Sequence, residues 1–185
     1  AGYYENPLEK IARICRFNPK ACFTILEKRI SDDQYFTHPE SLIQCIFRNA
    51  KSVDIYPHHL SHAASSLFLS SDQSSIAIVI DGVGEFDSTS IWHYGAGQIK
   101  KIGGCQIPNS VGLFYAAITS YLGFEVNEGE YKVMGLASYG KPTFADKLRA
   151  LVAKHKSLDH PYTISQDFLD LTGGGINLIR DNFAD

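Results

Sequence analysis

Three histidines within five residues are the part of this sequence best suited to chemistry. They lie in the segment PHHLSH at residues 57–62, where His58 and His62 stand four residues apart. On a helix these two imidazoles share one face, so both could bind a single metal ion. Two neutral imidazoles with a carboxylate suit Fe(II), Mn(II) or Zn(II). From the spacing alone, a metal site and a pair of structural histidines are equally open.

The candidate carboxylate is Asp81, which follows the apolar run IAIVI at residues 76–80 and begins the turn DGVGE. Gly82, Gly84 and Glu85 complete a turn whose backbone N–H groups could surround phosphate oxygens. The alternative is a tight hairpin in which glycine supplies a positive φ. A P-loop is excluded, because the sequence contains no GxxxxGK[ST] motif.

Three further residues are candidates for acid–base or charge chemistry. His59 follows the first candidate ligand but faces about 100° away on a helix, as a base or a supporting group would. It occupies the place of the glutamate in the HExxH helix of zinc proteases, so that motif is not matched. In NEGEYKVMGLASYGKP, residues 127–142, Glu130 could position a hydroxyl or a base and Lys132 could neutralise phosphate. The alternative is a solvated helix start whose acidic residues favour the helix dipole.

The elements that must position these residues follow from the hydrophobic pattern. We expect helices before the histidines, then a strand meander, then helices again, which indicates an α/β protein with an internal boundary near residue 70. This divides the chain into segments 1–70 and 71–185. The expected helices are 3–30 with a break at Asn18–Pro19, 39–48, 61–69, 111–122, 130–136 and 145–155, and the expected strands are 53–56, 76–80, 88–94 and 98–102.

Composition and charge narrow the class of protein. The chain of 185 residues is 44% hydrophobic and 20% charged, as in globular proteins. A formal net charge of -3 gives no reason to expect nucleic-acid binding. No apolar run approaches the roughly 20 residues of a membrane span. The four cysteines form no CxxC pair, so we expect reduced core residues and a cytoplasmic protein.

Four motifs in register carry a family resemblance. They are HHLSHAAS, IVIDGVGE, PNSVGLFYAAITSYLGF and NEGEYKVMGLASYGKP, which together span about residues 56–142. Their order and spacing resemble those of the O-carbamoyltransferases of nodulation and antibiotic biosynthesis. The segment YYENP near the start and the tail resemble the family more loosely.

This resemblance implies an actin/Hsp70-like (ASKHA) fold of two duplicated lobes around an ATP cleft. Residues 1–70 would be the helical end of the first lobe, and residues 71–185 the start of the second. It implies carbamoyl-adenylate formation from carbamoyl phosphate and ATP with Mg, then carbamoyl transfer to a small-molecule hydroxyl acceptor. The implied metal, Fe(II) or another divalent ion, would be held by His58, His62 and Asp81. The DGVGE turn would lie on the phosphate side, and Glu130 and Lys132 would line the cleft.

The resemblance also sets limits. The family's opening strands, a later metal-ligand aspartate and the domain that forms the carbamoyl-adenylate have no counterpart here. We therefore expect a piece of a longer enzyme that is inactive by itself. The remaining alternatives are a tRNA threonylcarbamoyl transferase-like enzyme, disfavoured by the net charge and the DGVGE turn, and a non-catalytic nucleotide-binding or scaffold module. Neither nucleic acid nor membrane is an expected partner, and homodimer formation is left open.

Overall fold

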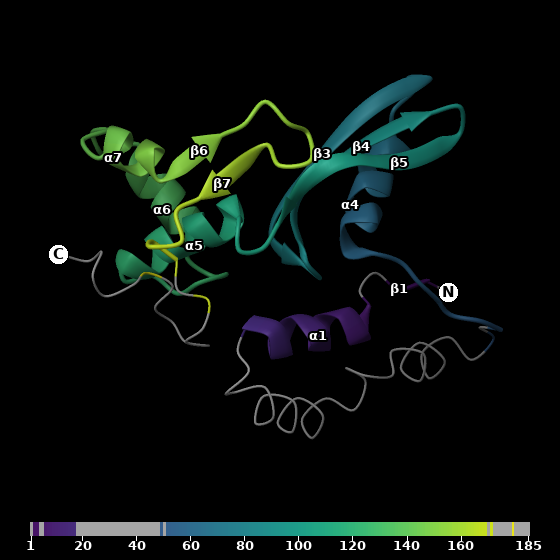
Figure 1. The fold of residues 1–185 in the computed structure, drawn as a ribbon, viewed down its shortest axis with the longest axis horizontal. Helices are drawn as coiled ribbons and strands as arrows, with labels where there is room; N and C mark the ends of the chain where they lie inside the picture. Colours follow the sequence, from purple (N-terminus) through teal and green to yellow (C-terminus); the bar gives the residue numbers. More distant parts are fainter. Residues whose placement is uncertain are drawn as a thin grey trace.

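A computed structural model describes residues 2–3, 6–17, 49, 51–169, 171 and 179. Its elements, in chain order, are β1 (Gly2–Tyr3), α1 (Pro7–Phe17), β2 (Asp54–Ile55), α4 (His58–Leu67), β3 (Ser74–Gly84), β4 (Asp87–Gly95), β5 (Gln98–Gln106), α5 (Val111–Tyr121), α6 (Glu130–Ala137), α7 (Ala145–Ala150), β6 (Val152–Lys154) and β7 (Tyr162–Ile164). The protein is thus a mixed α and β structure (Figure 1). The helices expected within residues 18–48 lie outside the described residues.

The largest sheet is an antiparallel meander, in the order β3-β4-β5. Its alternating pattern places Val79 and Trp92 on the face covered by α4, where they form a core with Ala63 and Leu67 of that helix. This core joins segments from both sides of the expected boundary near residue 70. Figure 1 shows α4 lying along the sheet.

A second core lies toward the C-terminal half. Ala117 of α5 packs with Ile164, Phe168 and Leu169, beside the antiparallel pair of β6 and β7. The expected helix over residues 145–155 is wrong in its second half, because α7 ends at Ala150 and the chain continues as β6. The hydrophobic residues of this short segment fit the period of a helix and that of a strand, and the antiparallel pairing with β7 stabilises the strand.

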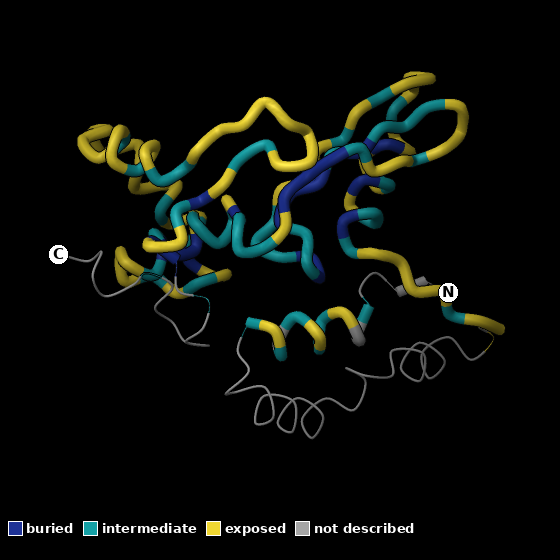
Figure 2. The backbone as a smooth tube through the Cα atoms, viewed as in Figure 1, coloured by how far each residue is buried: buried dark blue, intermediate teal, exposed yellow. Residues whose placement is uncertain are grey.

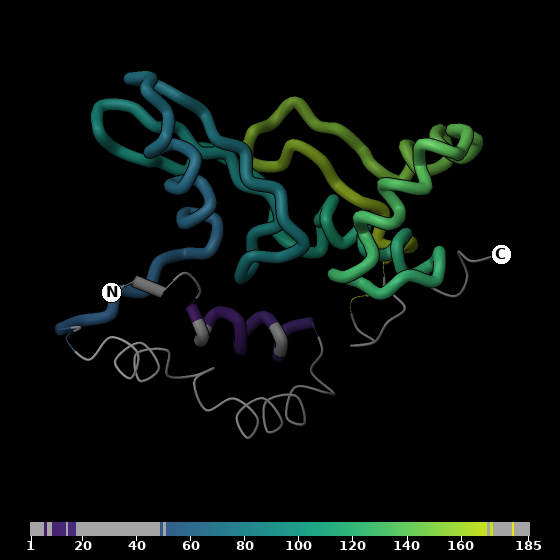
Figure 3. The backbone as a smooth tube through the Cα atoms, turned by 180° about the vertical axis from the view of Figure 1, so that it is seen from behind, coloured from purple at the N-terminus to yellow at the C-terminus, as the bar shows by residue number. Residues whose placement is uncertain are grey.

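Helix α1 and the residue before it contact the turn between β3 and β4. The backbone N–H of Asn6 donates to Glu85 Oε1 at 2.7 Å, and Arg13 Nη1 donates to the Glu85 carbonyl at 2.9 Å. Seen from behind, α1 again lies below that turn (Figure 3). The N-terminal helix is therefore attached to the hairpin that follows Asp81.

The cysteine expectation needs one correction. Cys105 is a buried free thiol, as expected, but Cys15 is disulfide-bonded. The absence of a CxxC pair does not exclude thiols that meet through the fold, so the expectation of reduced cysteines is wrong for Cys15. Cys22 and Cys45 lie outside the described residues. Among the described residues, no helix has the length and apolar character to span a membrane.

Candidate metal centre and adjoining cavity

The first turn of α4 and the end of β3 bring three candidate ligands together. His58 Nε2 lies 2.9 Å from Asp81 Oδ2 and 3.0 Å from His62 Nε2, and His62 Nε2 lies 3.8 Å from Asp81 Oδ2. The helix begins at His58, so the expected face shared by His58 and His62 is present. The expected cluster of two imidazoles and one carboxylate therefore forms within the chain.

A break in the sheet positions Asp81. The regular pairing of β3 with β4 stops at Ile80 and resumes at Gly84, so the intervening residues leave the ladder, as in a β-bulge. The side chain of Ser110 donates to the carbonyl of Gly82 at 2.6 Å and also accepts from Leu113 N at 3.0 Å as the N-cap of α5. One serine thus caps α5 and ties it to the bulge that carries the carboxylate.

Gly112 allows the first turn of α5 to lie close to the bulge at Asp81 and Gly82. A Cβ at this position would lie 2.5 Å from the carbonyl oxygen of Asp81 and 2.5 Å from the backbone nitrogen of Gly82. Only glycine lets the first turn of α5 pack so closely on the bulge.

The electrostatics favour an ionised carboxylate. Burial tends to raise the pKa of Asp81, but hydrogen bonds with His58 and with the Gly82 N–H outweigh it and hold the pKa below its usual value. The Gly82 N–H donates to Asp81 Oδ1 at 2.6 Å, which leaves Oδ2 directed at the imidazoles. A divalent cation requires a deprotonated carboxylate, and the ionised Asp81 supplies one beside two imidazole nitrogens.

The three ligand atoms fit a metal ion. Bonds of about 2.1 Å to nitrogen and oxygen would hold neighbouring ligand atoms about 3.0 Å apart at right angles and about 3.4 Å apart in a tetrahedron. The separations of 2.9, 3.0 and 3.8 Å bracket these values. His62 is about half exposed, so further ligands could reach the ion from solvent. The donor set is the mixed imidazole and carboxylate set expected for Fe(II), Mn(II) or Zn(II).

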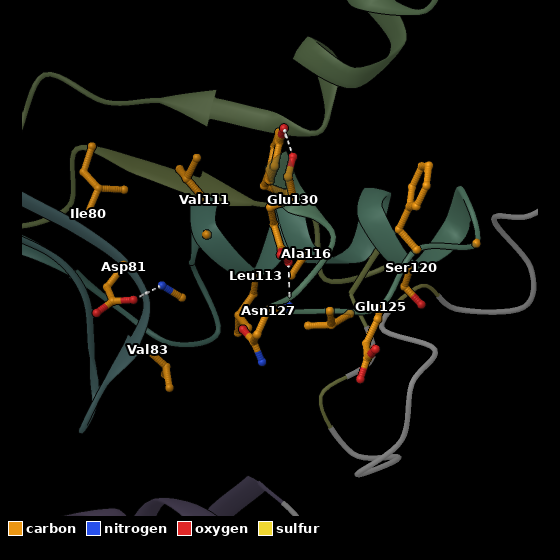
Figure 4. A pocket seen from close by; sticks show the side chains of 16 residues that line it. Ile80, Asp81, Val83, Val111, Leu113, Ala116, Ser120, Glu125, Asn127 and Glu130 are labelled. Carbon is orange, nitrogen blue, oxygen red and sulfur yellow. Dashed lines mark hydrogen bonds between the residues drawn. The ribbon is translucent and has the colours of Figure 1, made fainter. Parts of the chain in front are cut away.

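Asp81 also borders a large cavity. This open cavity of about 1360 Å³ lies between the bulge, α5 and the loop that leads into α6. Figure 4 shows Asp81 on one side of it, with Asn127 and Glu130 across from the carboxylate. Glu130 Oε1 accepts the Asn127 N–H at 2.9 Å, and Tyr115 donates to the Glu130 carbonyl at 3.2 Å. The metal corner and the segment of Glu130 therefore form opposite walls of one cavity.

The other expected site residues are not all at the cavity. Gly82 lines the large cavity, whereas Gly84 is buried against the histidine rings and Glu85 turns toward Asn6. Lys132 is exposed, with its ammonium 5.7 Å from the centre of the Tyr131 ring, and does not line the cavity. The tight hairpin is present, since Gly84 pairs with Asp87 across it. The expectation that glycine supplies its positive φ is wrong, because the residue with a positive φ of 58° is Glu85.

His59 is placed beneath the ligands rather than beside the cavity. Its side chain is 2% exposed, and burial lowers its pKa to about 4 against the opposing attraction of Asp87 and Asp81. Its Nδ1 lies 2.7 Å from Ser90 Oγ. The imidazole is therefore neutral near pH 7 and held inside the joint between α4 and the sheet.

Three residues that position the site escaped the sequence reasoning. Ser90 Oγ contacts His59 Nδ1, Trp92 donates to that same oxygen, and Ser110 donates to the Gly82 carbonyl in the bulge. Ser90 and Trp92 are two residues apart on β4 and therefore lie on the same face of the strand. A serine on the same face as a core tryptophan could have indicated a buried polar contact. Ser110 precedes an apolar helical run, which is an N-cap signal, but the carbonyl to which it donates follows from the fold alone.

Comparison with known proteins identifies the family. Residues 16–180 match the family described as carbamoyltransferase N-terminus. An uncharacterized protein of Synechocystis, sll1178, is 36% identical over 142 residues, which are 74% of this chain and 23% of that protein. The nodulation protein NolO of Bradyrhizobium diazoefficiens is 40% identical over 55% of this chain and 18% of its own length. NolNO of Sinorhizobium fredii is 38% identical over 49% of this chain and 13% of its own length.

The chain spans less than a quarter of the length of each of these relatives. The family match, by contrast, covers most of the chain and contains the histidines, Asp81 and the cavity. The comparison agrees with the family resemblance carried by the four motifs. This chain belongs to the carbamoyltransferase N-terminus family.

Proposed function

We propose that this chain forms the metal corner and part of the cavity of an ATP-dependent O-carbamoyltransferase with an actin/Hsp70-like pair of lobes. The intact protein would form carbamoyl-adenylate from carbamoyl phosphate and ATP with Mg, then transfer the carbamoyl group to a small-molecule hydroxyl. The observation that carries the proposal is the cluster of His58, His62 and Asp81 at the edge of a large cavity, in a chain of this family.

In this proposal His58, His62 and Asp81 would hold Fe(II) or another divalent ion. When bound, such an ion supplies Lewis-acid polarisation of the carbamoyl carbonyl. The acceptor oxygen attacks the carbamoyl carbon, the bond from that carbon to the phosphate oxygen of AMP breaks, and the hydroxyl proton passes to a base in the cavity. Glu130, on the wall opposite Asp81, is assigned to orienting the acceptor hydroxyl. The exposed Lys132 receives no role in this step.

The test uses the intact protein and carbon-14-labelled carbamoyl phosphate, with ATP, Mg and a panel of alcohols and sugars. We expect label transfer and about one bound transition metal per chain, both lost in a protein with His58→Ala and His62→Ala. The matched control is the exposed His160→Ala, which should retain both. Full transfer by the double variant would contradict the metal role.

Two other outcomes would replace the proposal. Label transfer to tRNA but to no alcohol would favour the threonylcarbamoyl transferase-like alternative. Absence of bound metal together with no rise in melting temperature on addition of ATP would favour a non-catalytic module.

A further inference from the structure

Helix α4 begins without a cap, although its first turn carries a candidate metal ligand. Its N-cap residue is Pro57, which offers no side-chain hydrogen bond, and the first turn contains no acidic residue. Helix ends without such partners fray. His58 is the first residue of this turn, so a contact other than a helix cap must hold its imidazole in position beside His62 and Asp81.

His59 is placed to make that contact and so to anchor the turn. It is 2% exposed, and its Nδ1 lies 2.7 Å from Ser90 Oγ on β4. Trp92 Nε1 donates to the same oxygen at 2.6 Å, and both Ser90 and Trp92 are buried. Two buried hydrogen bonds among these three polar groups therefore join the first turn of α4 to the central strand of the sheet.

Chemistry fixes one donor among these three groups. Indole only donates, so Ser90 Oγ accepts the hydrogen of Trp92. Ser90 Oγ and His59 Nδ1 share the second hydrogen bond, and the tautomer of His59 sets which of the two donates. This arrangement sets the rotation of the His59 ring as well as its position.

A close backbone contact completes the joint. A Cβ at Gly84 would lie 2.4 Å from His59 Cδ2 and 2.6 Å from His58 Cδ2. Gly84 lies on β3, three residues after Asp81. The strand that carries the carboxylate is therefore pressed against both imidazoles, and His59 is held between β3 and β4.

We propose that His59, Ser90 and Trp92 are positioning residues that fix the first turn of α4, and with it the separation of His58 from His62 and Asp81. This inference rests on the proposed metal site and deepens it. Loosening the anchor would release His58 first, because His62 lies one turn further into the helix. Metal affinity and coordination geometry would then change before the core formed by Ala63 and Leu67 is lost.

The test is a titration of the protein with Co(II), followed by visible absorption, on Ser90→Ala and the matched control Ser88→Ala. Ser88 is also fully buried on β4, but it donates to the carbonyls of Cys105 and Asn109, away from α4. We expect Ser90→Ala to weaken Co(II) binding by about tenfold or more and to alter the absorption bands. Ser88→Ala should bind with the affinity and spectrum of the unmodified protein.

Amide hydrogen exchange gives a second readout that needs no metal. The Ser61 N–H donates to the Pro57 carbonyl at 3.1 Å, closing the first turn of α4. We expect faster exchange at Ser61 and His62 in Ser90→Ala, a smaller change in Trp92→Phe, and none in Ser88→Ala. If Ser90→Ala fails to fold, His59→Gln and Trp92→Phe supply the same comparison.

The outcomes separate the two proposals. Wild-type Co(II) affinity, spectrum and exchange in both Ser90→Ala and His59→Gln would overturn the positioning role and leave the metal site intact. An unmodified protein that binds no Co(II) would overturn the metal site and this inference together. Faster exchange at Ser61 with weakened Co(II) binding supports both.

Discussion

The two walls of the large cavity are built differently. The metal wall is the end of β3, and it is backed by α4, in which His59, Ala63 and Leu67 are buried. The opposite wall contains Glu130 at the start of α6, a helix with no buried residue. Figure 2 shows the contrast as dark segments along the sheet and α4 and exposed segments over α6 and α7. The metal wall is thus supported by its own packing, whereas α6 is not.

The apolar residues that remain uncovered lie in two places. One is α6 and the loop after it, where Tyr131, Met134 and Tyr139 are exposed. The other is the outer face of β3, where Ile76, Ile78 and Ile80 are each more than 60% exposed. The chain spans less than a quarter of its curated relatives, and exposed apolar surface of this kind marks interaction sites. The comparison predicts that mutations will act strongly on the metal wall and weakly on α6.

The largest expected difference is in core truncation. Leu67→Ala on α4 removes a buried side chain and should lower the free energy of unfolding by about 3–4 kcal/mol. The matched Met134→Ala on α6 removes an exposed side chain and should change it by less than about 0.5 kcal/mol. Urea denaturation measures both. Equal effects of the two variants would contradict the contrast between the walls.

A second difference is in the pH dependence of stability. Burial lowers the pKa of His59 to about 4 from 6.5. Between these values the unfolded chain binds more protons than the folded one, so stability is greatest above pH 6.5 and falls as the pH is lowered toward 4. The contribution of His59 to this loss reaches about 3 kcal/mol. Denaturation at several pH values measures it, and His59→Gln should flatten the profile; an unchanged profile would show that His59 is not the group responsible.

The smallest expected difference concerns glycines. Gly84→Ala forces a Cβ into the histidine rings and should destabilise the protein by about 2 kcal/mol. In Gly135→Ala on α6, the new Cβ meets no atom within 4 Å, and the helix should gain roughly 0.5–1 kcal/mol. Thermal denaturation distinguishes the opposite signs. A stabilising Gly84→Ala would show that the bulge and α4 are not in the close contact described.

Periodicity and spacing predicted much of this arrangement. The four-residue separation of His58 and His62 predicted a shared helix face. The apolar run before Asp81 predicted a strand, which in the structure continues past the carboxylate to Gly84. The meander and α5 followed from alternation and helical spacing. These features depend on local sequence, which is why they were accessible.

Features that depend on tertiary contacts were not predicted. The direction of Glu85 toward Asn6, the exposure of Lys132 and the end of α7 at Ala150 are decided by neighbours distant in sequence. The hydrogen bonds of Ser90 to His59 and Trp92 are of the same kind. The segment DGVGE predicted a turn at Gly84, but the close approach of this glycine to two imidazoles appears only in the fold.

The most direct test of the account is the position of a bound metal. The measurement is a crystal structure of the protein grown with Co(II), with anomalous diffraction collected at the cobalt edge. We predict one strong anomalous peak about 2.1 Å from His58 Nε2, His62 Nε2 and a carboxylate oxygen of Asp81. A fully occupied peak elsewhere, or none at saturating Co(II), would contradict the assignment of these residues as the metal centre.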